Sequence, residues 1–401
     1  MLSPIQLYQK AYSGLSRHSW YLSLVILINR SGTMVIPFMT IYCTQQLHFS
    51  ITQAGFIMGL FGLGSISGAF LGGKLTDKYG FYDVQVGALL LGGLLFILLG
   101  FQKTFVSMGV VTFILSLCNE SFRPANSTAI AHHSSPENKT RSYSLNRLAI
   151  NLGWSFGGAL GGFLASVDYS LLFWVDGCTN ILAALLLIKM LPRTKPSAKP
   201  KGGSFDSLPA SAYKDKVYLA FIAMAVLYSI CFFQLFTIEP LFYHTQWHFS
   251  ERFIGGLMAM NGIIIAAVEM VLINNIEGKK HPLSFITIGV LLTGVAFLGL
   301  RYLQPSIWAG VIVVLLVTIG EMMAMPFMNA FWIVRTSEHN RGQYAALYSM
   351  AWSVAQIVAP TLGSQIILFG NFDLLWWVLA GMCVVSAVGF NLLYRFVSKK
   401  S

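Results

Sequence analysis

The stretch Gly72–Gly80, which reads GGKLTDKYG, is a short polar turn between two long apolar segments. The apolar segment that leads into it covers residues 51–73, and the segment that follows covers residues 84–101. A helix needs roughly 20 mostly apolar residues to cross a bilayer, because lipid offers no hydrogen-bond partner to an open peptide group. Both segments are about that long, so we expect the turn at a membrane surface between two transmembrane helices.

The composition of the whole chain indicates a membrane protein. Of its 401 residues, 55% are hydrophobic and only 10% are charged, and the mean hydropathy is +0.66. These values lie outside the range of soluble globular domains. We therefore expect an all-α membrane protein with twelve transmembrane helices, near residues 20–44, 51–73, 84–101, 105–130, 142–166, 170–191, 217–241, 251–273, 283–301, 306–331, 343–369 and 373–395.

The distribution of lysine and arginine predicts the orientation of the chain. Basic residues resist translocation and stay on the cytoplasmic side. Most of them fall in predicted loops on the side of the N-terminus, whereas Lys103, Arg252 and Arg301 fall on the other side. We expect both termini in the cytoplasm and the chain in a bacterial inner (cytoplasmic) membrane. The net charge of +11 is then a consequence of topology, and no basic face remains for a nucleic acid.

Residues 192–216 form the long hydrophilic stretch of the chain and are rich in Pro, Gly, Ser and Lys. Such a composition is typical of a linker. We expect a bundle of six helices over residues 1–191, a cytoplasmic linker over 192–216 and a second bundle of six helices over 217–401.

A weak internal repeat supports two related halves. Glu120 precedes Pro124 by four residues, and Glu321 precedes Pro326 by five. In both places a polar loop that ends in arginine follows. A duplicated six-helix unit is a property of secondary transporters, in which the binding site lies near the bilayer midplane.

The opening turn resembles the signature loop of the major facilitator superfamily, G-x-L-x-D-[RK]-x-G-[RK]-[RK], over its first eight positions. Phe81 and Tyr82 stand at its last two basic positions. The resemblance covers the whole chain and implies two bundles of six helices. It also identifies Gly73, Asp77 and Gly80 as the conserved positions of the loop.

The same resemblance implies a conformational latch. Gly73 would let its helix approach the helix that begins near Arg341, and Asp77 would face the positive end of that helix dipole and hold the outward-open state. Two simpler roles for Asp77 stay open, because it could cap the helix that follows or pair with Lys78.

The segment 142–166 is similar to a glycine motif of antiporter members of the superfamily, g-x-x-x-G-P-x-x-G-G. Gly158 stands in place of the proline. The resemblance favours solute:proton exchange, and small residues at these positions also allow tight helix packing. The matching positions are Gly153, Gly157, Gly161 and Gly162.

A second similarity is to proton-coupled oligopeptide transporters. It rests on the segment Tyr42–Ser50 and on Arg30, Arg123 and Glu321. The glutamates that this family carries on its first helix are absent, since Ile26 and Asn29 stand there. Proton-driven uptake of di- or tripeptides is therefore the alternative function.

Ionisable residues inside the predicted helices are candidates for the chemistry, because each costs at least ~2.5 kcal/mol near the bilayer centre. Glu120 and Glu321 are predicted near the midplane as proton-coupling groups, with Arg30 or Arg123 as the competing cation. Glu120 and Arg123 share a helix face, being three residues apart. A static salt bridge between them is the alternative.

Several further residues are candidates for substrate contacts or charge pairs. Glu239, before Pro240, is expected as a gate or as a solvated acid at the membrane interface. Glu269 is expected to reach toward cytoplasmic water. The other candidates are Arg147, Asn29 and Asn126.

The sequence thus predicts a proton-coupled secondary transporter that exports a small organic solute by alternating access. Its partners are the solute, protons and the lipid bilayer, and we expect a monomer. No P-loop, metal-binding spacing or nucleophile motif is present, so no enzyme activity, metal or cofactor is expected.

Overall fold

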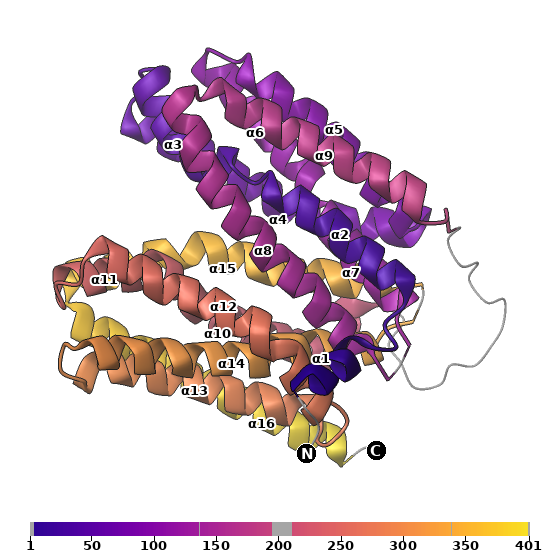
Figure 1. Cartoon of the computed structure of the whole chain (residues 1–401), viewed down its shortest axis with the longest axis vertical. Helices are drawn as coiled ribbons and strands as arrows, with labels where there is room; N and C mark the ends of the chain where they lie inside the picture. Colours follow the sequence, from indigo (N-terminus) through magenta and orange to yellow (C-terminus); the bar gives the residue numbers. More distant parts are fainter. Residues whose placement is uncertain (1–3, 136, 195–210, 338, 400–401) are drawn as a thin grey trace. The chain divides into compact units, whose positions relative to one another are not determined.

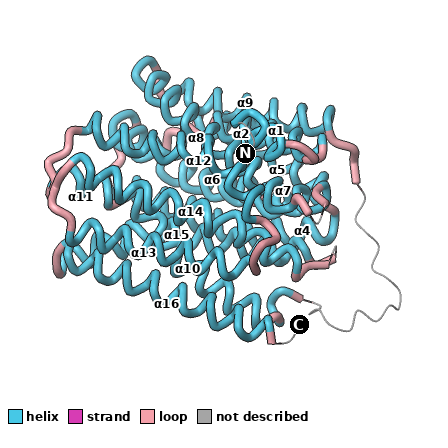
Figure 2. Tube along the Cα trace, turned by 60° about the horizontal axis from the view of Figure 1, so that its bottom comes forward, coloured by secondary structure: helices cyan, strands magenta, loops and turns pink. Residues whose placement is uncertain are grey.

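The computed structural model describes residues 4–135, 137–194, 211–337 and 339–399, and within them the regular structure is entirely helical (Figures 1 and 2). Most of the predicted linker, residues 195–210, lies outside the described residues. The helices are α1 Pro4–Tyr12, α2 Arg17–Ser31, α3 Val35–Ile41, α4 Ile51–Tyr79, α5 Phe81–Gly100, α6 Phe105–Glu120, α7 Phe122–His133, α8 Lys139–Val167, α9 Ser170–Met190, α10 Lys216–Thr237, α11 Glu239–Thr245, α12 Glu251–Ile276, α13 Pro282–Tyr302, α14 Ile307–Val334, α15 Arg341–Phe369 and α16 Phe372–Ser398. A π-helical turn, Tyr42–Gln46, extends α3, and a 3-10 turn, Ala212–Lys214, precedes α10.

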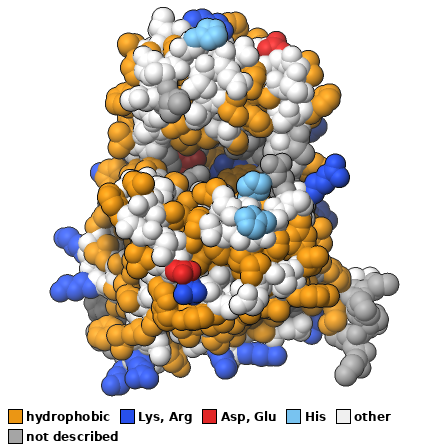
Figure 3. Space-filling view, turned by 90° about the vertical axis from the view of Figure 1, so that its left-hand side faces the viewer, with side chains coloured by type: hydrophobic (Ala, Val, Ile, Leu, Met, Phe, Trp, Pro, Cys, Tyr) orange, Lys and Arg blue, Asp and Glu red, His pale blue; other side chains and the backbone are white. Residues whose placement is uncertain are grey.

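Twelve spans in the described part of the chain are long and apolar enough to cross a membrane, which confirms the predicted number. Three of the spans are broken, and the sequence analysis did not foresee the breaks. One break separates α2 from α3, the second separates α6 from α7 at Ser121, and the third separates α10 from α11 at Ile238. Hydrophobic side chains cover much of the face drawn in Figure 3, on which acidic side chains are sparse.

The described residues pack as two compact units. Unit 1 comprises Met1–Ser13, Ala212–Arg335 and Ala351–Ser401, and unit 2 comprises Gly14–Ser211 and Thr336–Met350. The units follow the two halves of the sequence except for two segments. The N-terminal helix α1 packs on α12 in unit 1, and the first residues of α15 pack with unit 2.

Glycines set the closest helix contacts in each unit. In unit 2, α4 carries Gly64, Gly68 and Gly72 at four-residue intervals, and each lies against the backbone of α6 or of Ser121. A Cβ atom on Gly68 would lie 2.4 Å from the carbonyl oxygen of Leu117. Only glycine therefore allows this approach, which carries α4 directly into the opening turn.

In unit 1, α13 packs side by side with α14 and α16 (Figure 1). Gly289 and Gly320 mark the crossing of α13 and α14, where a Cβ atom on Gly289 would lie 2.4 Å from the carbonyl oxygen of Gly320. The crossing holds α14, and with it Glu321, against a rigid neighbour.

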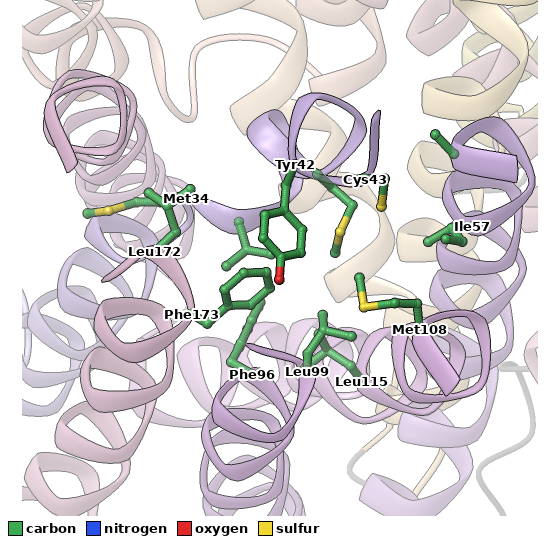
Figure 4. Close-up of a cluster of buried hydrophobic side chains, with 13 residues drawn as sticks. Met34, Tyr42, Cys43, Ile57, Phe96, Leu99, Met108, Leu115, Leu172 and Phe173 are labelled. Carbon is green, nitrogen blue, oxygen red and sulfur yellow. The ribbon is translucent and has the colours of Figure 1, made fainter. Parts of the chain in front are cut away.

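A hydrophobic cluster joins one end of the unit 2 helices (Figure 4). The rings of Tyr42 and Phe173 lie 4.9 Å apart, centroid to centroid, with Met34 and Phe96 in the same cluster. The cluster anchors α3 and its π-helical turn to α5 and α9.

Both units contain the same turn. Residues 46–50 read QLHFS and residues 246–250 read QWHFS, and in each unit the serine side chain caps the helix that follows. The central histidines, His48 and His248, have left-handed backbone angles of φ 56° and 54°. The duplication explains the segment that resembles oligopeptide transporters, because the segment ends in a turn that this chain uses twice.

A buried ion pair fixes the start of α10 in unit 1. The carboxylate of Asp215 accepts hydrogen bonds from the backbone amides of Val217 and Tyr218, both at 3.1 Å. It also accepts two bonds from the guanidinium of Arg335 at the end of α14, both at 2.9 Å. One carboxylate therefore satisfies a helix N-terminus and a cation.

We predict that Asp215→Ala lowers the free energy of unfolding in detergent by about 3 kcal/mol, because it removes the buried carboxylate that bonds the half-buried guanidinium of Arg335 and the first amides of α10. Asp83→Ala is the control, since Asp83 pairs with Arg193 at 3.0 Å where both side chains are exposed, and such a pair contributes little. Denaturant unfolding of the purified variants measures both. Equal losses would contradict this role for Asp215.

Candidate functional site

The break between α2 and α3 is held by a buried aspartate on α9. The carboxylate of Asp176 accepts the backbone N–H of Met34 at 3.0 Å and that of Val35 at 2.8 Å, the first amides of α3. Gly32 ends α2 and lies against Thr179 of α9, too close for any side chain. Asp176 was not among the predicted site residues, although it is a lone carboxylate within the apolar segment 170–191 and is visible as such in the sequence.

Asn29, a predicted substrate contact, belongs to the same polar group. Its amide donates to the side-chain oxygen of Asn180 at 2.9 Å, and Asn180 donates to the carbonyl oxygen of Asp176 at 2.8 Å. The network ties α2 to α9 just before the break. Both asparagines are buried, so we assign Asn29 to the framework of unit 2.

The predicted acid–base pair, Glu120 and Arg123, lies on either side of the break between α6 and α7. Nη1 of Arg123 lies 3.1 Å from Oε2 of Glu120, and the side chain of Glu120 is 10% exposed against 30% for Arg123. Arg30 of α2 experiences the charges of both residues. The structure thus brings three of the predicted charged residues together in unit 2.

Arg30 is held in place by the glycines of α8. A Cβ atom on Gly153 would lie 2.6 Å from Cβ of Arg30, and one on Gly157 would lie 3.1 Å from the carbonyl oxygen of Arg30. Gly161 packs on Met34 in the same way, while nothing lies within 4 Å of the position a Cβ would take on Gly158. Of the predicted motif, Gly162 makes only an ordinary contact, at 3.9 Å from the ring of Phe38.

Asn126 lies one helical turn after Arg123 in a polar chain that crosses three helices. Gln85 of α5 donates to its side-chain oxygen at 3.2 Å, and its amide donates to Asn146 of α8 at 3.1 Å. These bonds fix the face of α7 that carries Arg123. Arg147 follows Asn146 on α8 and is half-buried.

Unit 1 contains a cavity lined by two of the predicted carboxylates. Glu239 at the start of α11 and Glu321 in the middle of α14 both face it, together with Tyr243 and Asn261. The remaining lining is mostly apolar and includes Leu235, Ile254, Leu257, Val314 and Val317. The structure therefore places two acids in one apolar cavity.

The two carboxylates have different surroundings. Asn261 donates to Oε2 of Glu321 at 3.3 Å and to the hydroxyl of Thr318 at 2.9 Å. Oε2 of Glu239 is buried without a hydrogen-bond partner within the described residues, and the Tyr243 hydroxyl is its polar neighbour. Glu239 is 4% exposed. The expectation of a solvated interfacial acid was wrong, because the helix break before Pro240 turns Glu239 inward.

Glu269 is also buried instead of reaching cytoplasmic water. It is 2% exposed, because α1 packs on this part of α12. The Tyr8 hydroxyl donates to the carbonyl oxygen of Ala267. Burial and then the neighbouring Tyr8 and Glu269 raise the pKa of the Tyr12 hydroxyl, which keeps it a hydrogen-bond donor. The predicted helices begin near residue 20, so α1 and its packing over Glu269 were not predicted.

The opening turn makes the contact that the resemblance implied, within unit 2. Asp77 accepts the backbone N–H of Gly342 at 2.7 Å and that of Gln343 at 3.0 Å, at the start of α15. A Cβ atom on Gly73 would lie 2.3 Å from that of Ala346. Asp77 therefore caps α15, and the start of α5 at Gly80 (φ 93°) has no side-chain cap.

The other expected partners of the turn lie elsewhere. The ammonium of Lys78 sits over the ring of Tyr79, 4.8 Å from its centroid. Arg341 donates from Nε to the Thr336 hydroxyl at 3.3 Å. The acceptor for the two α15 amides is thus the aspartate itself, while Arg341, the first residue of α15, bonds to the loop before the helix.

These features identify the family. The family model described as Major Facilitator Superfamily matches residues 22–353 and 285–401, and the chain belongs to this superfamily of membrane transporters. It is not an enzyme.

Curated relatives are distant but cover most of the chain. A Na⁺, Li⁺, K⁺/H⁺ antiporter of Planococcus maritimus is 24% identical over 92% of this chain and 93% of its own. Multidrug resistance protein 2 of Bacillus subtilis is 21% identical over 90% and 91%. Quinolone resistance protein NorA of Staphylococcus aureus is 21% identical over 83% and 85%.

Solved structures support the fold. A bacterial homologue of the iron transporter ferroportin superposes with a TM-score of 0.78 at 15% identity, over 94% of this chain and 100% of its own. A human organic anion transporter superposes with a TM-score of 0.74 at 13% identity, over 93% and 99%. At these identities the likeness concerns the fold alone.

We predict that Gly153→Ala costs about 1 to 3 kcal/mol of unfolding free energy, because the added methyl group collides with Arg30. Gly158→Ala meets open space, so it should leave stability unchanged or raise it by up to about 1 kcal/mol through helix propensity. Denaturant unfolding in detergent measures both variants. The packing of α8 on α2 is misassigned if the two changes cost the same.

We predict that Asp77→Ala speeds hydrogen exchange at the amides of Gly342 and Gln343 by about tenfold, since each loses a charged acceptor. Mass spectrometry of the peptide over residues 336–350 measures this. Asp83→Ala, in the same region but without a bond to α15, should leave the rate unchanged. Unchanged exchange in Asp77→Ala would show that another group holds these amides.

Proposed function

We propose that this protein exports a small organic solute in exchange for protons, by alternating access. Membership of the superfamily supports secondary transport, and the distant relatives named for drug resistance and for cation/proton antiport support efflux. The Lys and Arg distribution supports a chain with both termini in the cytoplasm of a bacterial cell. We propose that a single chain carries out transport.

The observation that carries the proposal is the cavity of unit 1. Glu239 and Glu321 line the same apolar space. Two ionised carboxylates there would repel each other with little water to screen them. A proton on one of them, or a positively charged solute beside them, relieves this repulsion. The cavity can therefore hold either species and favours one at a time.

Exchange follows from this competition. When a proton neutralises Glu321, a cationic or amphipathic solute loses part of its electrostatic attraction and leaves. When the proton leaves, the cavity regains its charge and attracts the next solute. Leu235, Ile254 and Leu257 provide the apolar surface for the rest of the solute. Of the two acids predicted to carry protons, we retain Glu321 in this role and pair it with Glu239.

Glu120 has a different role in this proposal. It is paired with Arg123 at 3.1 Å and lies near Arg30. We therefore propose it as the fixed counter-ion of unit 2 and not as the exchanging acid. Asp77 and its contact with α15 act on conformational change and not on solute, as the superfamily resemblance implies.

Peptide uptake was suggested by the segment Tyr42–Ser50 and by Arg30, Arg123 and Glu321. The segment ends in a turn that recurs at residues 246–250 with the same left-handed histidine, so the segment does not favour peptides over other solutes. The transport test below still distinguishes uptake from export. In uptake the solute moves in the same direction as the protons, and in export it moves in the opposite direction.

We predict that Glu321→Gln and Glu239→Gln each reduce proton-driven efflux at least tenfold, because neither amide can exchange a proton. The assay uses purified protein in liposomes, with ethidium as the outgoing probe and an imposed pH gradient. Glu137→Gln is the matched control, since Glu137 is an exposed carboxylate outside the spans.

The wild type should move ethidium in the direction opposite to proton flow. Wild-type rates in both cavity variants would overturn the role of the cavity. Proton-driven accumulation of a labelled dipeptide in the same vesicles, without ethidium export, would replace the proposal with peptide symport.

A further inference from the structure

We propose that unit 2 binds a carboxylate group of the transported solute between Arg30 and Arg123, so that the solute is a zwitterion, with a carboxylate as well as a cationic group. This inference rests on the proposed transport function and adds the chemical class of the solute. It concerns the cluster of Arg30, Glu120 and Arg123, which we call the arginine cluster.

The first argument is charge. The arginine cluster contains two guanidinium groups, which stay protonated in proteins, and one carboxylate. Its three side chains therefore sum to one positive charge, in membrane spans where a charge without a counter-ion costs several kcal/mol. A solute carboxylate would bring the sum to zero.

The second argument is the engagement of the other carboxylates of unit 2. Asp176 accepts the amides of Met34 and Val35, and Asp77 accepts those of Gly342 and Gln343. Asp83 pairs with Arg193. Asp168 accepts hydrogen bonds from the backbone amide and the hydroxyl of Ser170, and Glu137 is exposed outside the spans. Among the described carboxylates of unit 2, Glu120 is therefore the counter-ion bonded to an arginine of the cluster.

The third argument is the state of Arg30. Its Nε atom is buried and has no hydrogen-bond partner within the described residues. A guanidinium presents its N–H groups as a planar fork that matches a carboxylate with two parallel bonds. Gly153 and Gly157 hold the backbone of Arg30 rigidly against α8, so little ordering is needed when a solute binds.

The role of Glu120 determines whether its removal should strengthen or weaken anion binding. Glu120 competes with the solute carboxylate for Arg123, to which it is bonded at 3.1 Å. Removing its charge makes the arginine cluster more positive and frees Arg123. Loss of Glu120 should therefore strengthen anion binding, whereas loss of Arg30 should abolish it. A purely structural salt bridge would give no such gain.

The experiment measures binding to the purified protein in detergent, without a membrane or a proton gradient. The probes are benzoate and benzamide, which share a shape and differ in charge, and thermal stabilisation reports binding. We expect wild type to prefer benzoate at least tenfold. Arg30→Gln should remove this preference, and Glu120→Gln should bind benzoate several-fold more tightly than wild type.

Two controls keep the result interpretable. Arg193→Gln removes an exposed arginine and should keep the preference for benzoate. If Arg30→Gln does not fold, Arg30→Lys keeps the positive charge without the planar guanidinium and should show a reduced preference for benzoate. Glu120→Gln still tests whether benzoate binds more tightly when the glutamate charge is removed.

Equal binding of benzoate and benzamide to wild type would overturn the proposal, as would weaker benzoate binding in Glu120→Gln. Either result leaves proton-driven ethidium efflux untouched. Conversely, a preference for benzoate in a protein that shows no proton coupling would retain the anion site and reject the antiport.

Discussion

The low polarity of a bilayer is the constraint on which this structure depends, because a polar group there must find its partner within the chain. Three helix starts find their partner in the same way. Asp176 accepts the first amides of α3, Asp215 those of α10 and Asp77 those of α15. In each case a carboxylate satisfies the open end of a helix. The break in a span and the start of a helix are thereby fixed without water.

Charged side chains that do not cap a helix have opposite signs in the two units. Unit 2 holds the arginine cluster, in which two arginines face one glutamate. Unit 1 holds a cavity with Glu239 and Glu321, where Asn261 and Tyr243 are the polar neighbours. One unit thus offers positive charge and the other offers negative charge. The proposed anion site assigns a solute carboxylate to the first, and the proposed exchange assigns the proton to the second.

The sequence was sufficient for the number of spans, since each shows as a long apolar segment. The superfamily resemblance also pointed to the partner of Asp77, because the signature turn has a known counterpart near Arg341. The helix breaks were beyond such reasoning. A break at Gly32–Met34 is stable only because Asp176 lies beside it, and Asp176 comes from another helix. Hydropathy cannot show which distant side chain satisfies an amide.

The same limit explains the errors at single residues. Glu239 was expected at a wet interface from its place near a span end, yet the turn before Pro240 buries it. Glu269 is buried because α1, a short helix before the first span, packs on α12. The repeated turn at residues 46–50 and 246–250 was detectable by comparing the chain with itself. It concerns local backbone geometry, which is the part of a fold that short sequence motifs encode best.

The most direct test of the account measures proton movement driven by solute alone. Purified protein is reconstituted into vesicles loaded with ethidium and a pH-sensitive dye. The vesicles are then diluted into ethidium-free buffer of the same pH, so that the outward ethidium gradient is the driving force. Antiport predicts that outward ethidium flow draws protons in, so that the vesicle interior acidifies in wild type and not in Glu321→Gln. Ethidium efflux with an interior that stays at constant pH or becomes alkaline would contradict the account.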